Sequence, residues 1–195
     1  MNAKSDRIPA DERRVQILDA AVEVFGRYGY AAATTDRVAK GAGISQPYVV
    51  RMFGTKEQLF IETLGHTLAR LLRTFRAALA EADAEGLSAE ARLGAAYLEL
   101  VGDRGVLLTL LHGFMMGADP AIGPVARGGF FEVYRMLRQE AGFTPEQARS
   151  FLAEGMLINT LIGLDVRPTD DLATAELLAC TFGDDVPESF ERSIA

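Results

Sequence analysis

Residues 38–53 read VAKGAGISQPYVVRMF, and their spacing predicts two short helices joined by a tight turn. Ala39 stands four residues before Gly43, and Val49 follows in the second helix. Two helices that cross near a right angle need a small residue where they touch, a glycine able to adopt positive φ at the turn, and an apolar residue that closes the small core. These three residues meet those needs, so the segment is predicted to form a helix-turn-helix.

The second helix of this pair is expected to run from Gln46 to Phe53, with Ser45 as its N-cap. At 100° per residue, Val49, Met52 and Phe53 share its inner face. The side chains predicted to point outward or to flank that outer face are Gln46, Pro47, Tyr48, Val50 and Arg51.

This outer face has the chemistry of a DNA-reading surface. Glutamine can bind adenine edges, arginine can bind guanine edges or phosphate, and small apolar side chains can touch a thymine methyl group. Hydroxyl groups and a cation at the N-terminal ends of helices can bind the phosphates of the DNA backbone. The residues expected at phosphates are Thr34, Thr35, Ser45 and Lys56. The spacing leaves one alternative open, a solvated three-helix bundle in which these residues cap the helices and do not bind DNA.

The rest of the chain has the apolar periodicity of helices, and no alternating run indicates a strand. We therefore expect an all-α fold in which residues 183–195 form a frayed tail. The other helices are predicted at Glu12–Tyr28, Thr35–Ala42, Lys56 to about Asp83, Ser88–Val101, Val106–Met116, Val125–Ala141, Thr144–Leu164 and Leu172–Phe182.

Composition narrows the class of protein further. The chain has 195 residues, of which 49% are hydrophobic and 24% charged, as in ordinary globular proteins. The longest uncharged stretch in its apolar middle, residues 105–118, is too short to span a bilayer. The N-terminus has no apolar signal core, and one cysteine, Cys180, cannot form an internal disulfide. We therefore expect no membrane association and a cytoplasmic location.

The net charge of −7 is distributed unevenly along the chain. Residues 1–58 contain nine Lys and Arg against seven Asp and Glu, whereas residues 59–195 contain eleven against twenty. A mildly basic first part on an acidic remainder suggests that only the first part faces a polyanion.

The sequence offers little for catalysis. Its two histidines, His66 and His112, lie far apart and form no pair with metal-ligand spacing. Gly41 and Gly43 lack the third glycine of a dinucleotide-binding motif, because Gln46 stands there. We expect no enzyme activity, no catalytic residue, no metal and no cofactor.

Residues 13–60 read RRVQILDAAVEVFGRYGYAAATTDRVAKGAGISQPYVVRMFGTKEQLF and resemble the DNA-binding unit of the TetR family of bacterial transcriptional regulators. The resemblance implies a homodimer, a larger helical domain with an effector pocket, and repression relieved by a small molecule. It also implies that Thr34 is the phosphate-contacting cap, that Gly43 forms the turn, that Ser45 to Arg51 belong to the recognition helix and that Lys56 begins the linking helix. This sequence has Val50 where the family most often has an aromatic residue, and Asp36 at a position that is often basic or neutral.

We expect a DNA-binding domain at residues 1–58 and an effector-binding and dimerisation domain at residues 59–195. Aromatic, methionine and apolar side chains with a few polar tips suit an adaptable ligand pocket. The pocket residues predicted on this basis are Phe75, Tyr97, Leu111, His112, Met115, Met116, Phe131 and Tyr134. Plain core packing of the same residues is the alternative.

The last two predicted helices carry more apolar surface than sealing a monomer requires, and the resemblance implies that they form a four-helix dimer interface. The residues predicted in that interface are Phe151, Leu152, Met156, Leu157, Leu161, Leu178 and Phe182. The alternative is that they belong to the core of one chain.

These observations predict a dimeric DNA-binding regulator, a repressor that a small, largely apolar ligand releases from double-stranded operator DNA. The alternative is a helical ligand-binding or scaffolding protein whose N-terminal bundle does not read DNA.

Overall fold

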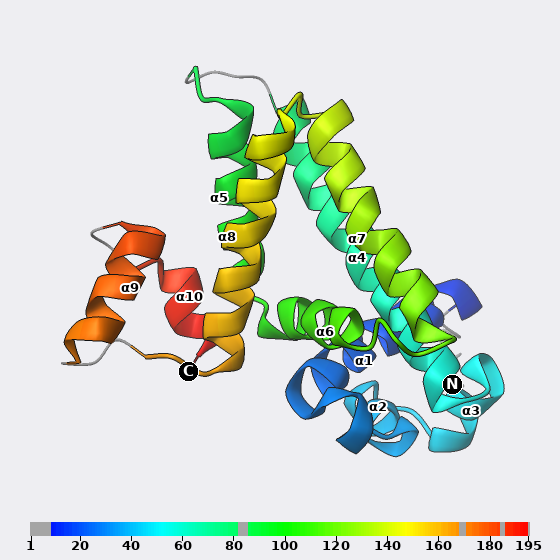
Figure 1. Ribbon diagram of the computed structural model, residues 1–195. Helices are drawn as coiled ribbons and strands as arrows, with labels where there is room; N and C mark the ends of the chain where they lie inside the picture. The colour runs from blue at the N-terminus through cyan, green and yellow to red at the C-terminus, as the bar shows by residue number, and fades with distance from the viewer. Residues whose placement is uncertain (1–8, 82–85, 168–170, 184–185, 195) are drawn as a thin grey trace, which may run out of the picture.

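A computed structural model of the chain describes residues 9–81, 86–167, 171–183 and 186–194. This part of the chain is all-α, as predicted, with ten helices and no strand (Figure 1). The helices are α1 (Ala10–Ala32), α2 (Thr35–Gly41), α3 (Gln46–Phe53), α4 (Lys56–Ala80), α5 (Ala89–Val101), α6 (Arg104–Met115), α7 (Ile122–Gln139), α8 (Pro145–Gly163), α9 (Leu172–Phe182) and α10 (Glu188–Ser193).

The predicted helix-turn-helix forms from α2 and α3. Ala39 is buried where the two helices meet, and Val49 is buried on the inner face of α3. Gly43 adopts φ +65° in the turn, a conformation that side chains other than glycine rarely accept. Thr34 caps α2 by accepting a hydrogen bond from the backbone N–H of Arg37 at 3.2 Å. The roles predicted from the spacing for Ala39, Gly43 and Val49 are therefore confirmed.

Two details at the helix ends differ from the predictions. Ser45 occupies the N-cap of α3, but its side chain makes no capping hydrogen bond there. The helix predicted to end at Tyr28 is interrupted at Gly29, with φ +66°, and then continues to Ala32. The glycine therefore breaks the helical path without ending the helical segment, which carries the chain towards α2.

Helices α6 and α7 each begin a few residues before the predicted start, and an aspartate side chain accepts backbone hydrogen bonds at each start. The side chain of Asp103 accepts a hydrogen bond from the backbone N–H of Val106, so α6 starts at Arg104. Asp119 accepts hydrogen bonds from the N–H groups of Ala121 and Ile122, each at 2.9 Å, at the start of α7. These carboxylates satisfy first-turn donors that have no partner within the helix.

The C-terminal segment is not the frayed tail that we predicted. Residues Glu188–Ser193 form α10, and the Phe190 side chain is fully buried. The ring of Phe190 packs against that of Phe182 in α9, with 4.8 Å between the ring centroids. Burial of one aromatic ring and of Ile194 provides the apolar contact that holds this short helix.

The long helices rise from a base containing α1, α2 and α3 (Figure 1). Helix α4 packs on both α5 and α7. Helix α8 packs on α6 and α7, and the Tyr97 hydroxyl of α5 donates a hydrogen bond to the Gly155 carbonyl of α8. Helix α6 lies across the foot of these helices and packs most extensively against α1. Helix α6 therefore contacts both α1 in the base and the helices above it.

The contact between α1 and α6 depends on a glycine in α1. A Cβ atom added at Gly26 in α1 would lie 2.7 Å from the Cα atom of Gly105 in α6. The two backbones can approach this closely because Gly26 has no side chain. At Gly105, an added Cβ atom would instead meet the end of the Glu23 side chain, 2.9 Å away. One turn further along α6, the Thr109 hydroxyl donates a 3.1 Å hydrogen bond to the buried carbonyl of Val22.

No helix within the described ranges combines the length and the apolar composition that crossing a bilayer requires.

We expect the Gly26→Ala substitution to lower the free energy of unfolding by about 1 to 3 kcal/mol, because the new methyl group forces two backbones apart. Urea denaturation followed by circular dichroism measures this change. The matched control is Gly94→Ala in α5, where an added Cβ meets nothing within 4 Å. Better helix propensity should make that variant neutral or more stable by up to about 1 kcal/mol. Equal stability of the two variants would contradict the close α1–α6 contact.

Candidate nucleic-acid interface and effector cavity

Helix α3 turns one polar face outward, as its sequence predicts. Val49 and Phe53 are buried against the rest of the unit, and Met52 is half-buried. The exposed side chains on the opposite face are Gln46, Pro47, Val50 and Arg51, with Tyr48 half-buried beside them. Because the inner residues fix the rotation of the helix, the outer residues have a defined direction.

Neighbouring side chains hold the polar groups of this face. The amide of Gln46 donates a hydrogen bond to the Thr35 hydroxyl at 3.2 Å, which joins α3 to the start of α2. The guanidinium of Arg51 lies over the Tyr48 ring, 4.8 Å from its centroid. These contacts leave the carbonyl oxygen of Gln46 and the N–H groups of Arg51 available to base edges.

The predicted phosphate-binding residues lie at the starts of α2, α3 and α4, as the sequence predicts. Lys56 also holds two helices together, a role that sequence reasoning missed. Its ammonium group donates hydrogen bonds to the carbonyls of Tyr30 and Ala31 at 3.0 and 3.2 Å. It also lies 4.6 Å from the centroid of the Tyr30 ring. Lys56 therefore joins the C-terminal end of α1 to the first turn of α4.

Asp36 in α2 forms an exposed ion pair with Lys40, with 2.8 Å between the carboxylate oxygen and the ammonium nitrogen.

A second candidate site is an apolar cavity of about 50 Å³ enclosed by α4 to α8. Its lining is almost entirely aromatic and aliphatic. The lining residues are Leu71, Phe75, Tyr97, Leu110, Phe114, Phe130, Val133, Phe151, Leu152, Gly155, Met156 and Asn159. A drug-sized ligand needs several hundred Å³, on the order of 300 or more. The cavity in this conformation is therefore smaller than the ligands that such pockets hold.

Only two of the eight predicted pocket residues, Phe75 and Tyr97, line this cavity. Leu111, Met116 and Tyr134 are half-buried elsewhere, and Met115 and Phe131 are exposed by 76% and 54%. His112 instead packs on α1. These residues belong to the correct helices but to other faces, because Leu110 and Phe114 are the α6 residues that face the cavity.

His112 connects α6 to α1 at the point where α1 is interrupted. A Cβ added at Gly29 would lie 3.4 Å from the Cε1 atom of the His112 ring. Partial burial lowers the pKa of His112, and a hydrogen bond with the Gly26 backbone opposes that shift. The neutral ring is therefore favoured in a contact close to the helix-turn-helix.

The cavity contains one polar pair. The Tyr97 hydroxyl lies within hydrogen-bond distance of the Asn159 side-chain oxygen, at 2.7 Å, and of the Gly155 carbonyl, at 2.9 Å. Burial raises the pKa of Tyr97, so its hydroxyl stays a neutral donor. Sequence reasoning missed Asn159, although a single amide within the apolar run MLINTLIG was a usable signal.

The predicted dimer residues divide between the inside and the surface of this chain. Phe151, Leu152 and Met156 line the apolar cavity of this chain, and their place in a dimer interface stays a prediction. Leu161 and Leu178 are buried within the chain, and Phe182 packs on Phe190. Leu157 is exposed by 37%. Other exposed apolar residues near it in sequence are Leu164, Leu172 and Leu177.

Comparison with known proteins places the helix-turn-helix in a family. Residues 17–63 match the model of bacterial regulatory proteins of the tetR family. The chain is similar to the HTH-type transcriptional activator FasR of Mycolicibacterium smegmatis, with 41% identity over 78 residues. That match covers 40% of this chain and 36% of FasR, so the chain spans about a third of the relative's length.

Solved structures extend the likeness to most of the chain. A TetR-family member, SCO1917 from Streptomyces coelicolor A3, is 27% identical, with a TM-score of 0.63 over 87% of this chain and 98% of that chain. The multidrug binding protein EbrR, complexed with imidazole, is 26% identical, with a TM-score of 0.57 over 93% and 97%.

We expect the Lys56→Ala substitution to lower the free energy of unfolding by about 1 to 2 kcal/mol, because two carbonyls at the end of α1 lose their donor. If Lys56 also contacts a phosphate, the slope of log affinity against log salt should fall by about one for every DNA sequence. Denaturant unfolding and binding titrations at several salt concentrations measure the two effects separately. An unchanged salt slope would remove Lys56 from the phosphate contacts.

Proposed function

We propose that this chain, which belongs to the TetR family of bacterial regulators, is a transcriptional regulator that binds operator DNA as a homodimer and is released by a small, largely apolar ligand. The observation that carries the proposal is the exposed face of α3. Buried Val49 and Phe53 fix its rotation, and Gln46 and Arg51 project their hydrogen-bonding groups outward. An α-helix fits the major groove, where those two side-chain types discriminate between base pairs.

The proposed dimer uses the exposed apolar side chains of α8 and α9. Leu157 and Leu177 are exposed by 37% and 42%, and Leu172 at the start of α9 is exposed by 80%. Apolar surface of this kind is stabilised when a second copy covers it. A two-fold dimer would present two α3 helices to half-sites about 34 to 36 Å apart, or to a multiple of that spacing.

The apolar cavity supports the proposed effector site, and its small volume supports a mechanism. A ligand of ordinary size must move α4 to α8 apart, because the present cavity of about 50 Å³ is too small. Helix α6 lines the cavity with Leu110 and Phe114 and packs on α1 through its opposite face. We therefore expect ligand binding to displace α6 and, through α1, to change the separation of the two α3 helices.

Repression is the proposed mode of regulation, with activation as the other outcome, since the relative FasR is named an activator. A protein that reads operator DNA acts where the chromosome lies, so we propose a cytoplasmic location. Binding to the DNA upstream of its own gene, measured against salt, tests the proposal. A helical scaffolding protein would show neither sequence preference nor salt dependence.

We expect Arg51→Ala, and separately Gln46→Ala, to weaken operator binding by roughly 1 to 3 kcal/mol while affinity for random DNA changes little. These side chains are proposed to contact base edges, which only the operator presents correctly. Fluorescence anisotropy with matched operator and random duplexes measures both affinities. Arg149→Ala, on the exposed surface of α8, is the control that should alter neither. Equal losses on the two duplexes would mean that Arg51 and Gln46 only position the protein.

The release mechanism requires reciprocity between the two sites. If an effector lowers operator affinity by a given factor, the operator must lower effector affinity by the same factor. Calorimetric titration of an effector into the protein, with and without operator DNA, measures that factor. Equal effector affinities in the two titrations would contradict release of the repressor even if both ligands bind.

A further inference from the structure

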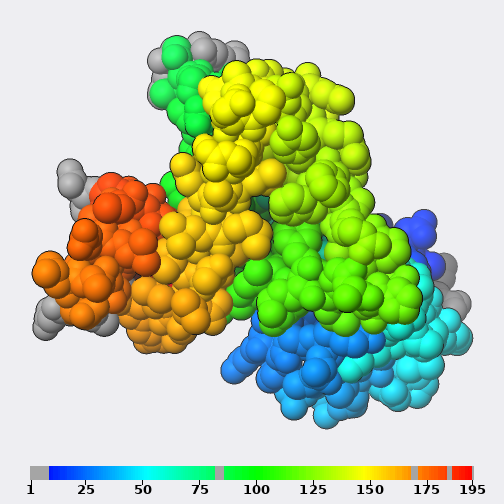
Figure 2. All heavy atoms as spheres, viewed as in Figure 1, coloured from blue at the N-terminus to red at the C-terminus, as the bar shows by residue number. Residues whose placement is uncertain are grey.

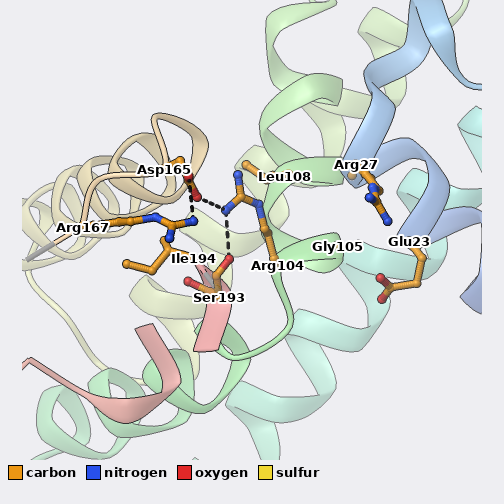
Figure 3. A pocket seen from close by; sticks show the side chains of 10 residues that line it. Glu23, Arg27, Arg104, Gly105, Leu108, Asp165, Arg167, Ser193 and Ile194 are labelled. Carbon is orange, nitrogen blue, oxygen red and sulfur yellow. Dashed lines mark hydrogen bonds and ion pairs between the residues drawn. The ribbon is translucent and has the colours of Figure 1, made fainter. Parts of the chain in front are cut away.

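A polar hollow of about 460 Å³ opens beside the start of α6 (Figure 3), and its lining includes none of the apolar cavity's residues. It lies between α1, the first turns of α6, the chain that follows α8, and the C-terminal end of α10. Figure 3 shows Glu23 and Arg27 on the α1 side and the Arg104, Asp165 and Arg167 side chains on the other. Figure 2 shows a recess between the part of the surface formed by α1 and the part formed by the end of α8.

Positive charge exceeds negative charge on the side of this hollow that Arg104, Asp165 and Arg167 form. The Arg104 guanidinium donates from Nη1 to the Asp165 carboxylate at 3.0 Å and to the Ser193 carbonyl at 2.9 Å. Arg167 donates from Nη2 to the other oxygen of Asp165 at 3.1 Å. One carboxylate therefore serves two guanidiniums. Within the described part of the chain, Nε and Nη2 of Arg104 have no hydrogen-bond acceptor.

Arg27 adds a third guanidinium from the α1 side. Its guanidinium carbon lies over the Tyr28 ring, 5.5 Å from the ring centroid, and no carboxylate among the described residues forms an ion pair with it. Glu23 lines the same hollow one turn earlier, but its carboxylate lies over Gly105, next to Asp103. Burial and the neighbouring Asp103 raise the pKa of Glu23, and Arg70 opposes that shift. With Glu23 and Asp165 both counted as charged, the lining still has three guanidiniums against two carboxylates.

We infer that this hollow binds a small molecule carrying a carboxylate or phosphate group, held between Arg27 and Arg104. The planar guanidinium fork matches the oxygen atoms of both groups. Leu108 and Ile194 supply a short apolar surface for the rest of the molecule. The volume falls in the range of small-molecule sites, roughly 300 to 1,000 Å³.

The site is distinct from the apolar cavity in both position and chemistry, since the two linings share no residue. Its occupant would bridge α1, which carries the helix-turn-helix, to the C-terminal end of the chain. The inference does not rest on DNA binding or on the apolar effector, so it can be tested on the protein alone.

The test is isothermal titration calorimetry of inorganic phosphate and of succinate into the full chain, at constant ionic strength maintained with chloride. We expect saturable binding of at least one of the two anions. Binding of phosphate alone identifies a phosphate-bearing ligand, binding of succinate alone identifies a carboxylate, and binding of both supports the shared oxyanion site.

Arg27→Gln should weaken that binding about tenfold or more, since it removes a charge-assisted hydrogen-bond donor. This variant is preferred to Arg104→Gln because Arg27 makes no ion pair with any described residue, whereas Arg104 pairs with Asp165. Circular dichroism of Arg27→Gln checks that the variant is folded. Arg149→Gln, which removes a surface charge outside the hollow, should bind as the unchanged protein does. Absence of saturable binding of either anion, or equal affinity in Arg27→Gln, overturns the inference.

Discussion

The contact between the backbones of α1 and α6 is the constraint on which the rest of the structure depends. Gly26 has no side chain, so α1 approaches the backbone of Gly105 to a distance that a larger residue at position 26 would prevent. This contact holds α6 against the base of the molecule, with its other face turned to the apolar cavity. One helix therefore contacts both the segment that carries α3 and the site proposed for the effector, and packed interfaces of this kind move between discrete arrangements.

The helix-turn-helix is small, but it is not an isolated unit. The rings of Phe25 and Tyr30 in α1 pack on Phe60 in α4, at centroid distances of 4.8 and 5.1 Å. Helix α4 runs without interruption from Lys56 to Ala80, so the proposed domain boundary at residue 58 falls within its first turns. A continuous helix and a shared aromatic cluster allow a displacement in the upper helices to reach α3, whereas a flexible linker would absorb it.

The apolar cavity and the polar hollow use different physical principles for selectivity. In the cavity, the Tyr97 and Asn159 pair is the polar feature within an aromatic and aliphatic lining, so shape and one hydrogen-bonding position would select a ligand. In the hollow, arginine side chains from separate elements face the same space, so charge and bidentate geometry would dominate. A regulator with both sites would respond to two classes of small molecule.

The sequence by itself determined the helix-turn-helix, the all-α class and the strong helix caps, because those features depend on residues within a few positions of one another. Ala39, Gly43 and Val49 specify a turn through local contacts, and Thr144 and Gln147, three residues apart, form a capping box at the start of α8. Local sequence did not determine which faces of α6 and α8 point inward. Leu110 and Phe114 line the cavity whereas Leu111 and Met115 do not, although all four are equally apolar in the sequence. When a helix is apolar on several faces, its periodicity cannot fix its rotation, and only packing against helices distant in sequence decides it. The same reason explains why the sequence did not predict α10, because its buried Phe190 ring packs on Phe182 only in the folded chain.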